Sequence, residues 1–299
     1  MSPSKSLVGL AFLLVLGACR NMPMATPVGD AAPATAIAVA PQGPAADDNL
    51  NAVVWQQTSD EYRLIATEVW LAAGHQLDRA LKDRLWDALV REDRDTPIRG
   101  LAPAVILDVD ETVLDNSPYQ ARLIRDHKSF DELSWANWVH EEAATAVPGA
   151  LAFTRDATAR GITVYYVSNR AEDLGESTLN NLRKLGFPIA NREQFLGLGS
   201  ILDGCEENGS EKSCRRRSIG RHHRVLLQVG DQIGDMATVL ANTPEGRTRA
   251  VAPYLQWIGE RWFVLPNPTY GSWEPALFNN DWAQPAAARR RQKIDALRF

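Results

Sequence analysis

Three short apolar runs, each followed at once by polar residues, most constrain the fold of this chain. They occupy residues 104–107, 162–167 and 225–229. Amphipathic segments of helical length lie between them, near 151–160 and 177–185. Such runs are typical of strands buried on both faces, and strands that alternate with helices indicate a parallel α/β sheet. Apolar residues at helical spacings between positions 53 and 85 predict one or two helices before the first strand.

The polar residues after these runs are expected to meet, because ligands of a parallel sheet bind beyond the carboxyl ends of its strands. The three clusters are Asp108-Val109-Asp110, Ser168-Asn169-Arg170 and the loop 230–235, which contains Asp231 and Asp235. Unpaired carboxylates repel one another and destabilise a fold, so we expect a cation between them. The oxygen donors of Asp108, Asp231 and Asp235 suit Mg²⁺, which binds through a few carboxylates and a substrate phosphate.

The overall charge does not point to a nucleic-acid partner. The formal net charge is -5 and the pI is near 5.6. The basic clusters at 215–217 and 289–291 are interpreted as solvated faces. The 45% hydrophobic content is ample for the core of one large or two small domains.

The N-terminus resembles a bacterial lipoprotein signal. Lys5 precedes an apolar run at 7–16, and Leu16-Gly17-Ala18-Cys19 matches a lipobox. We expect removal of residues 1–18, lipidation of Cys19, and an Ala/Pro-rich tether over 19–48. By the same resemblance, Arg20 favours an outer-membrane lipoprotein that faces the periplasm or the surface. A plain secretory signal is the alternative; a retained transmembrane helix is weaker, because spanning a bilayer takes about 20 residues.

Two further cysteines, Cys205 and Cys214, flank a polar loop that contains glycine. In an oxidising periplasm this pair could form a disulfide. Two free or buried thiols remain an equal alternative, because the sequence does not fix the distance between them.

The segment 108–117, Asp-Val-Asp-Glu-Thr-Val-Leu-Asp-Asn-Ser, resembles the first motif of class C acid phosphatases in the haloacid dehalogenase (HAD) superfamily. Segments 54–62 and 265–274 resemble the bacterial lipoprotein members, often called lipoprotein acid phosphatases or 5′-nucleotidases. The resemblance implies a HAD-like Rossmannoid parallel sheet flanked by helices, with a smaller, mainly helical cap. The phosphatase domain would span 49–299, with cap elements from about 49–100 and 116–147.

The resemblance also implies catalytic roles. Asp108 would be the nucleophile that forms an aspartyl-phosphate, and Asp110 the general acid and base. Ser168 would bind a phosphoryl oxygen, and Lys212 would neutralise the phosphoryl group. Lys184 competes with Lys212 on charge alone, although its helical segment favours solvent exposure.

The implied metal site uses the same strand ends. Mg²⁺ would bind the Asp108 side chain, the Asp110 backbone carbonyl and Asp231, while Asp235 would hold a metal-bound water. Relatives often have Asn-Leu where this chain has Gln232-Ile233, which affects the loop but not its carboxylates.

Substrate contacts are expected from Ser168, Asn169 and Arg170. By resemblance, Trp135 and Tyr270 are candidates for a clamp that stacks on a nucleobase. The alternative is that both aromatic rings serve packing, which is the commoner role of tryptophan.

These residues predict a Mg²⁺-dependent phosphomonoesterase that acts on small esters such as nucleoside monophosphates. One alternative is a non-catalytic binding or storage lipoprotein on the same fold, as plant relatives with a replaced nucleophile imply. Another is a phosphotransferase, or a phosphatase for phosphosugars or phosphoproteins. The family resemblance alone is compatible with a homodimer.

Overall fold

A five-stranded parallel sheet is the centre of the computed structural model, which describes residues 48–204, 206 and 209–299. Its strand order is β5-β4-β1-β6-β7, and each neighbouring pair is parallel. The strands are β1 (Ala102–Leu107), β4 (Thr163–Ala171), β5 (Phe195–Leu198), β6 (His223–Gly230) and β7 (Trp262–Val264). The predicted parallel α/β fold is confirmed, and the three apolar runs are its three central strands.

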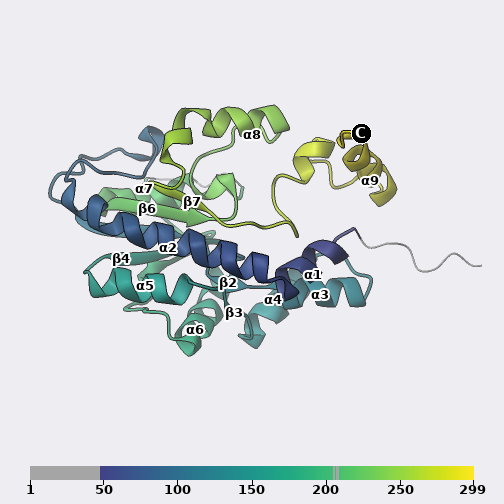
Figure 1. Cartoon of the computed structure of the whole chain (residues 1–299), viewed down its shortest axis with the longest axis horizontal. Helices are drawn as coiled ribbons and strands as arrows, with labels where there is room; N and C mark the ends of the chain where they lie inside the picture. The colour runs from purple at the N-terminus through teal and green to yellow at the C-terminus, as the bar shows by residue number, and fades with distance from the viewer. Residues whose placement is uncertain (1–47, 205, 207–208) are drawn as a thin grey trace, which may run out of the picture. The chain divides into compact units, whose positions relative to one another are not determined.

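Helices cover both faces of this sheet. The long helix α2 (Asp60–Lys82) crosses one face beside α5 (Ala150–Ala159), as Figure 1 shows, and α6 (Gly175–Leu185) packs into the same core. Helix α7 (Ser213–His222) packs on the opposite face. The side chains of β1 alternate accordingly, with Val105 and Leu107 in the first core and Ile106 in the second.

A smaller, largely helical group holds the segment that follows β1. It consists of α1 (Leu50–Thr58), α3 (Ser117–Arg125), α4 (Glu132–Glu141) and a two-stranded antiparallel sheet of β2 (Leu114–Asp115) and β3 (Thr145–Ala146). Helices α1, α3 and α4 lie together in Figure 1. The Asp131 side chain caps α4 by accepting a hydrogen bond from the Ser134 backbone at 2.9 Å. The exact extent of a cap within 49–100 and 116–147 stays a prediction.

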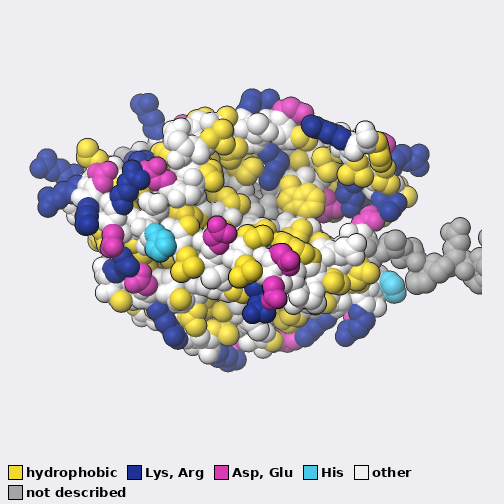
Figure 2. All heavy atoms as spheres, in the orientation of Figure 1, with side chains coloured by type: hydrophobic (Ala, Val, Ile, Leu, Met, Phe, Trp, Pro, Cys, Tyr) yellow, Lys and Arg dark blue, Asp and Glu magenta, His cyan; other side chains and the backbone are white. Residues whose placement is uncertain are grey.

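The remaining elements lie before, between and after the strands of the sheet. They are α8 (Pro244–Val251), α9 (Ala286–Asp295) and the short 3₁₀ helices Arg91–Asp93, Glu172–Leu174, Arg192–Gln194, Ile233–Asp235, Ala252–Trp257 and Pro275–Phe278. Within the described ranges, no helix combines the length and the apolar content needed to cross a bilayer. Figure 2 shows charged side chains of both signs scattered over the visible face among hydrophobic ones.

The predicted signal at 1–18, the lipidated Cys19 and nearly all of the tether lie outside the described residues. Cys205 lies outside them as well. Cys214 is disulfide-bonded in the structure, which excludes the alternative of a free thiol at that position.

Candidate active site

Three carboxylates meet where the central strands end. Asp108 follows β1, Asp231 follows β6, and Asp235 ends the short helix Ile233–Asp235. One oxygen atom from each lies within 4.8 Å of the others. We call these three residues the carboxylate edge. Gly230 makes the approach of Asp235 possible, because a Cβ atom at position 230 would lie 2.2 Å from Asp235 Oδ2.

Lys212 is the cation that contacts this edge. Its Nζ atom donates to Asp108 Oδ1, to Asp235 Oδ1 at 2.8 Å and to the Val167 carbonyl at 2.8 Å. Although burial opposes its charged form, the attraction of Asp108 and Asp235 raises the pKa of Lys212. Lys184 instead lies at the surface and pairs with Glu142. The structure therefore brings Lys212, and not Lys184, to the predicted site.

The carboxylate edge carries more negative charge than Lys212 balances. Burial raises the pKa of Asp108 to about 7 against the lowering effect of Lys212, and Asp235 and Asp110 raise it further. Burial, together with Asp108 and Asp235, raises the pKa of Asp231 well above its ordinary value. Buried carboxylates that repel one another are stabilised when they bind either a proton or a cation. Their hard oxygen atoms and close spacing fit a divalent metal ion such as Mg²⁺.

Asp110 has a different environment. Its Oδ1 atom accepts hydrogen bonds from Asn116 Nδ2 and Arg170 Nε, both at 2.9 Å, and its Oδ2 atom accepts one from the Ser168 hydroxyl at 3.1 Å. We call Asp110, Asn116 and Arg170 the arginine side of the site. Ser168 and Arg170 were predicted to contact substrate, and in the structure both contact Asp110.

Asn169 lies apart from these groups. Its side chain is exposed and accepts a hydrogen bond from Arg215 Nη2 at 2.8 Å. Arg215 and Arg216 are fully buried, so the interpretation of 215–217 as a solvated face is wrong for these two residues. Arg215 also donates to the Ser168 carbonyl and so holds this end of β4 in place. Asn169 could still reach a ligand beyond the strand.

Glu111 ties the first motif to the C-terminal segment. It is fully buried at a positive φ of 55°, which is uncommon for a residue other than glycine. Its carboxylate accepts hydrogen bonds from the Asn116 backbone at 2.7 Å and from the Tyr270 hydroxyl. Burial raises the pKa of Glu111 well above its ordinary value, and the nearby Asp110 and Asp231 add to the effect.

The two predicted clamp residues have separate partners. The Trp135 ring packs against Tyr119, with 5.1 Å between ring centroids, and against Phe130. The Arg170 guanidinium lies 5.3 Å from the centroid of the Trp135 ring. No ring contact joins Trp135 to Tyr270 in the part of the chain that the structure describes. The clamp therefore stays a prediction.

Asn267, in the segment 265–274, is a site residue that the sequence did not predict. Asn267 Nδ2 donates to Asp231 Oδ2 at 2.7 Å, and Gln232 Nε2 donates to the same atom at 3.0 Å. The two prolines that flank Asn267 were the available signal, because they mark a rigid turn that can aim a side chain. Asn116 and Glu111 were visible in the first motif without an assigned role.

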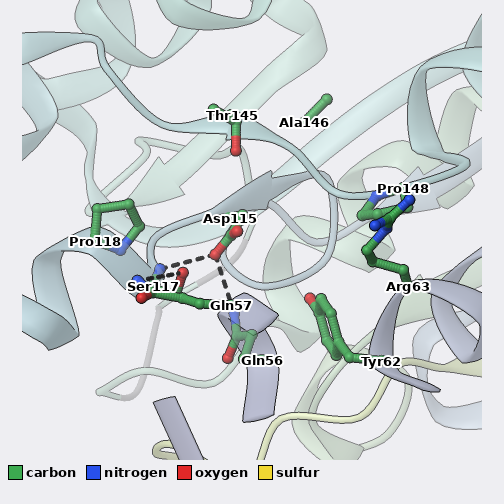
Figure 3. A pocket seen from close by; sticks show the side chains of 10 residues that line it. All are labelled: Gln56, Gln57, Tyr62, Arg63, Asp115, Ser117, Pro118, Thr145, Ala146 and Pro148. Carbon is green, nitrogen blue, oxygen red and sulfur yellow. Dashed lines mark hydrogen bonds between the residues drawn. The ribbon is translucent and has the colours of Figure 1, made fainter. Parts of the chain in front are cut away.

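A pocket of about 440 Å³ is lined in part by Asp115 and Ser117 at the end of the first motif and by residues of α1 and α2 (Figure 3). Gln56 Nε2 donates to Asp115 Oδ1 at 3.1 Å, and the Ser117 backbone donates to the same oxygen atom at 2.8 Å. Gln57 Nε2 donates to the Ser117 hydroxyl at 3.2 Å. These hydrogen bonds tie the junction of α1 and α2 to the motif. Among the described residues, Gln56 Oε1 and the Tyr62 hydroxyl are nevertheless buried in the lining without a hydrogen-bond partner.

The family of the chain follows from a comparison with known protein families. The model of the HAD superfamily, subfamily IIIB (acid phosphatase), matches residues 15–273. The chain belongs to this acid phosphatase family. The resemblance noted in the first motif is thereby confirmed.

Solved structures and curated relatives agree with this family. The crystal structure of the class C acid phosphatase from Bacillus anthracis with tungstate bound is 30% identical, with a TM-score of 0.72, over 84% of this chain and 97% of that one. A second structure of the class C acid phosphatase from Bacillus anthracis is 29% identical, with the same TM-score and coverage. These likenesses confirm the HAD-like fold.

Two plant proteins are also similar. Acid phosphatase 1 from Solanum lycopersicum is 28% identical over 170 residues, and the stem 31 kDa glycoprotein from Glycine max is 27% identical over 165 residues. Each match covers 55% of this chain. The chain spans little more than half the length of these relatives, 57% and 58%.

Proposed function

We propose that this protein is a Mg²⁺-dependent acid phosphatase that hydrolyses small phosphomonoesters through an aspartyl-phosphate. The observation that carries the proposal is the carboxylate edge with Lys212 beside it: Asp108, Asp231 and Asp235 lie within 4.8 Å of one another at the strand ends. Membership of the acid phosphatase family supports the same chemistry.

Asp108 is the proposed nucleophile. One of its carboxylate oxygens forms a bond to phosphorus as the bond from phosphorus to the leaving oxygen breaks. The Thr112 hydroxyl donates to Asp108 Oδ2 at 2.9 Å and Lys212 contacts Oδ1, so the carboxylate is held from two directions. Lys212 also supplies a buried positive charge close to the developing negative charge.

Asp110 is the proposed general acid and base. In the first step it gives a proton to the departing oxygen, and in the second it takes a proton from the water that attacks phosphorus. That attack breaks the bond between phosphorus and Asp108, releases phosphate and restores the free carboxylate. Asp110 lies two residues after the nucleophile in the sequence. Hydrogen bonds from Asn116 and Arg170 hold its carboxylate in a fixed orientation, so the same group can serve both steps.

The residues present fit a divalent metal ion. Asp108, Asp231 and the Asp110 carbonyl would hold Mg²⁺, with Asp235 close by. The bound ion would supply positive charge that polarises the phosphoryl group and relieves the repulsion among the carboxylates.

Nucleoside monophosphates are the proposed substrate class. Trp135 and Tyr270 both contact residues that border Asp110, through Arg170 and Glu111 respectively. Aromatic rings at these places are suited to stack on a base, which contributes about 1–3 kcal/mol per base in nucleic-acid sites.

We also propose that the mature protein is an outer-membrane lipoprotein anchored through Cys19. The lipobox at 16–19 and the Ala/Pro-rich segment that follows support this location. A Cys19→Ala precursor should fail to incorporate labelled palmitate and should stay unprocessed. Normal labelling of that variant would refute the anchor.

The decisive experiment is phosphate release by the purified protein from AMP, a phosphosugar and 4-nitrophenyl phosphate, with Mg²⁺ or with EDTA. We expect release that EDTA abolishes, with AMP preferred to the phosphosugar. Release that EDTA leaves unchanged would refute the metal. If the folded protein releases no phosphate from any of these esters but binds AMP in calorimetry, that result would favour a non-catalytic binding lipoprotein.

A further inference from the structure

Arg170 is held by protein partners through all three nitrogen atoms of its guanidinium. Its side chain is buried, with 2% of the residue exposed. Its Nε atom donates to Asp110 Oδ1 at 2.9 Å, Nη1 to the Thr178 hydroxyl at 3.1 Å and Nη2 to Asn116 Oδ1 at 3.1 Å. The central carbon of the guanidinium lies over the Trp135 ring, 5.3 Å from its centroid. Every nitrogen atom of the guanidinium therefore already has a protein partner.

The two oxygen atoms of Asp110 accept different numbers of hydrogen bonds. Oδ1 receives two donors, from Arg170 and from Asn116 Nδ2. Among the described residues, Oδ2 accepts a hydrogen bond from the Ser168 hydroxyl alone, and that hydroxyl in turn accepts the Arg170 backbone N–H at 3.0 Å. Arg170 thus holds one oxygen atom directly and fixes the partner of the other. A carboxylate held in this way can rotate little about its own axis.

Asn116 closes the arrangement. Its side-chain oxygen accepts from Arg170 Nη2 and from Trp138 Nε1, the latter at 2.9 Å, which fixes the orientation of its amide group. The amide nitrogen then points to Asp110 Oδ1. Because Asn116 is fully buried, this orientation has no competition from solvent.

We propose that Arg170 is a positioning residue for Asp110 and not a ligand of the substrate's phosphoryl group. By saturating Oδ1, it leaves Oδ2 as the atom that carries the proton. When the bond from Asp108 to phosphorus forms and the bond to the leaving oxygen breaks, the proton on Oδ2 passes to that oxygen. This inference rests on the proposed role of Asp110 as general acid.

The chemistry of arginine fits this role better than that of lysine. A planar guanidinium presents several N–H groups in a fixed fork and can lie flat on an indole ring. A lysine ammonium at position 170 would keep the charge but could not reach Asp110, Asn116 and Thr178 together in a fixed geometry. Arg170→Lys therefore keeps the positive charge and removes the geometry of the guanidinium fork. Arg170→Gln removes the positive charge as well.

The experiment compares leaving groups through kcat/KM, which excludes the later hydrolysis of the aspartyl-phosphate. AMP has a poor leaving group that needs a proton, whereas 4-nitrophenyl phosphate has a good one that needs little help. Because general acid catalysis contributes about 100-fold or more, we expect Arg170→Lys and Arg170→Gln to lower kcat/KM for AMP by about 100-fold. For 4-nitrophenyl phosphate we expect a loss of about 5-fold or less, since the acid contributes little there. An equal loss for both esters would overturn the proposal.

Inhibition by inorganic phosphate gives a second, independent readout. A positioning residue should leave the inhibition constant within about threefold of its original value, whereas losing a charged phosphate contact costs about tenfold or more. A tenfold weaker inhibition by phosphate in Arg170→Lys would mean that Arg170 binds the phosphoryl group, and would overturn the proposal.

Two further variants control for folding. Arg224→Lys also replaces a buried arginine, but Arg224 donates only to the backbone carbonyls of Ala80, Leu81, Asp83 and Trp86. It should alter thermal stability without a difference between the two esters. Thr178→Val removes a single, outer partner of Arg170 and should give a smaller loss with the same preference for AMP. If the Arg170 variants do not fold, an equal loss for both esters in Thr178→Val would overturn the proposal.

Asp110→Asn separates this inference from the proposed function. If Asp110→Asn lowers kcat/KM for AMP far more than for 4-nitrophenyl phosphate while the Arg170 variants do not, only the inference about Arg170 fails. If Asp110→Asn itself has no such preference, the assignment of the general acid fails.

Discussion

The carboxylate edge and the arginine side lie next to each other, yet their charges are balanced in opposite ways. On the arginine side, Asp110 meets a guanidinium, an amide and a hydroxyl. At the carboxylate edge, three acids share one lysine, and the pKa values of Asp108 and Asp231 are raised. The hydrogen-bonding groups of the first region satisfy one another, whereas the carboxylates of the second favour binding of a proton or a cation.

This difference suits the arginine side to positioning a catalytic group and the carboxylate edge to binding a ligand. A region whose polar groups satisfy one another can hold a catalytic group in a fixed geometry but has little capacity for a ligand. A region with excess like charge is costly for the fold and gains stability from whatever neutralises it. The predictions below alter one region at a time.

The largest effect should come from Asp108→Asn. The amide is nearly isosteric with the carboxylate but cannot form the phosphoenzyme, so we expect turnover to fall by more than about 10⁴-fold. Phosphate release and circular dichroism measure activity and fold. The control is Asp126→Asn, an exposed aspartate paired with Arg125, which should keep full activity. Activity of Asp108→Asn within tenfold of the original would show that the nucleophile is assigned wrongly.

Asn267→Ala should weaken the support of Asp231, the proposed metal ligand. It also removes the oxygen atom that accepts from Thr269 and from the Tyr270 backbone, so circular dichroism must show an intact fold. Because such supporting hydrogen bonds are worth about 10-fold to 100-fold in metal affinity, Mg²⁺ binding measured by calorimetry should weaken by that factor. Asn242→Ala is the matched control, since Asn242 donates to the Ser272 carbonyl and to Asn280 and to no carboxylate. Equal Mg²⁺ affinity in the two variants would count against a role for Asn267.

The sequence predicted the carboxylate edge better than the arginine side. Strand ends of a parallel sheet converge, so the register of three apolar runs was enough to bring Asp108, Asp231 and Asp235 together. The same reasoning could not find the partner of Arg170. Its contacts with Asn116 and Thr178 depend on how the helical segments pack beside β4, and strand register does not determine that packing.

The fold shows the same division. The three central strands are long and apolar, and the sequence predicted them. The edge strands β5 (Phe195–Leu198) and β7 (Trp262–Val264) were missed, because they are too short to give a periodic signal and become strands only by pairing with β4 and β6.

The excess charge of the carboxylate edge should appear as a pH dependence of stability without metal. Folding raises the pKa of Asp108 from 3.8 to about 7. Between these values the folded state holds a proton that the unfolded state has released, so the free energy of unfolding should fall as pH rises. One proton corresponds to about 3 °C per pH unit in a domain of this size. Thermal melts in EDTA between pH 4.5 and 7.5 measure the slope.

Asp108→Asn is the control for that slope, because it removes the group that titrates. Its melting temperature should depend less on pH over the same range, and added Mg²⁺ should stabilise the original protein most at the upper end. A slope that is identical in the two proteins would assign the pH dependence to other groups.

The smallest expected effect concerns a buried polar group outside the site that lacks a hydrogen-bond partner, and it tests whether that group affects the stability of the fold. Tyr62 is a buried residue that lines the pocket of Figure 3, and its hydroxyl has no hydrogen-bond partner among the residues that the structure describes. Tyr62→Phe removes a polar group that folding has desolvated without compensation, so the free energy of unfolding should stay within about 0.5 kcal/mol or rise. Tyr119→Phe is the matched control: its hydroxyl bonds to the Ser134 hydroxyl at 2.9 Å, and its loss should cost about 1 kcal/mol. Urea denaturation measures both. A cost for Tyr62→Phe equal to that for Tyr119→Phe would mean that the hydroxyl of Tyr62 has a hydrogen-bond partner in solution.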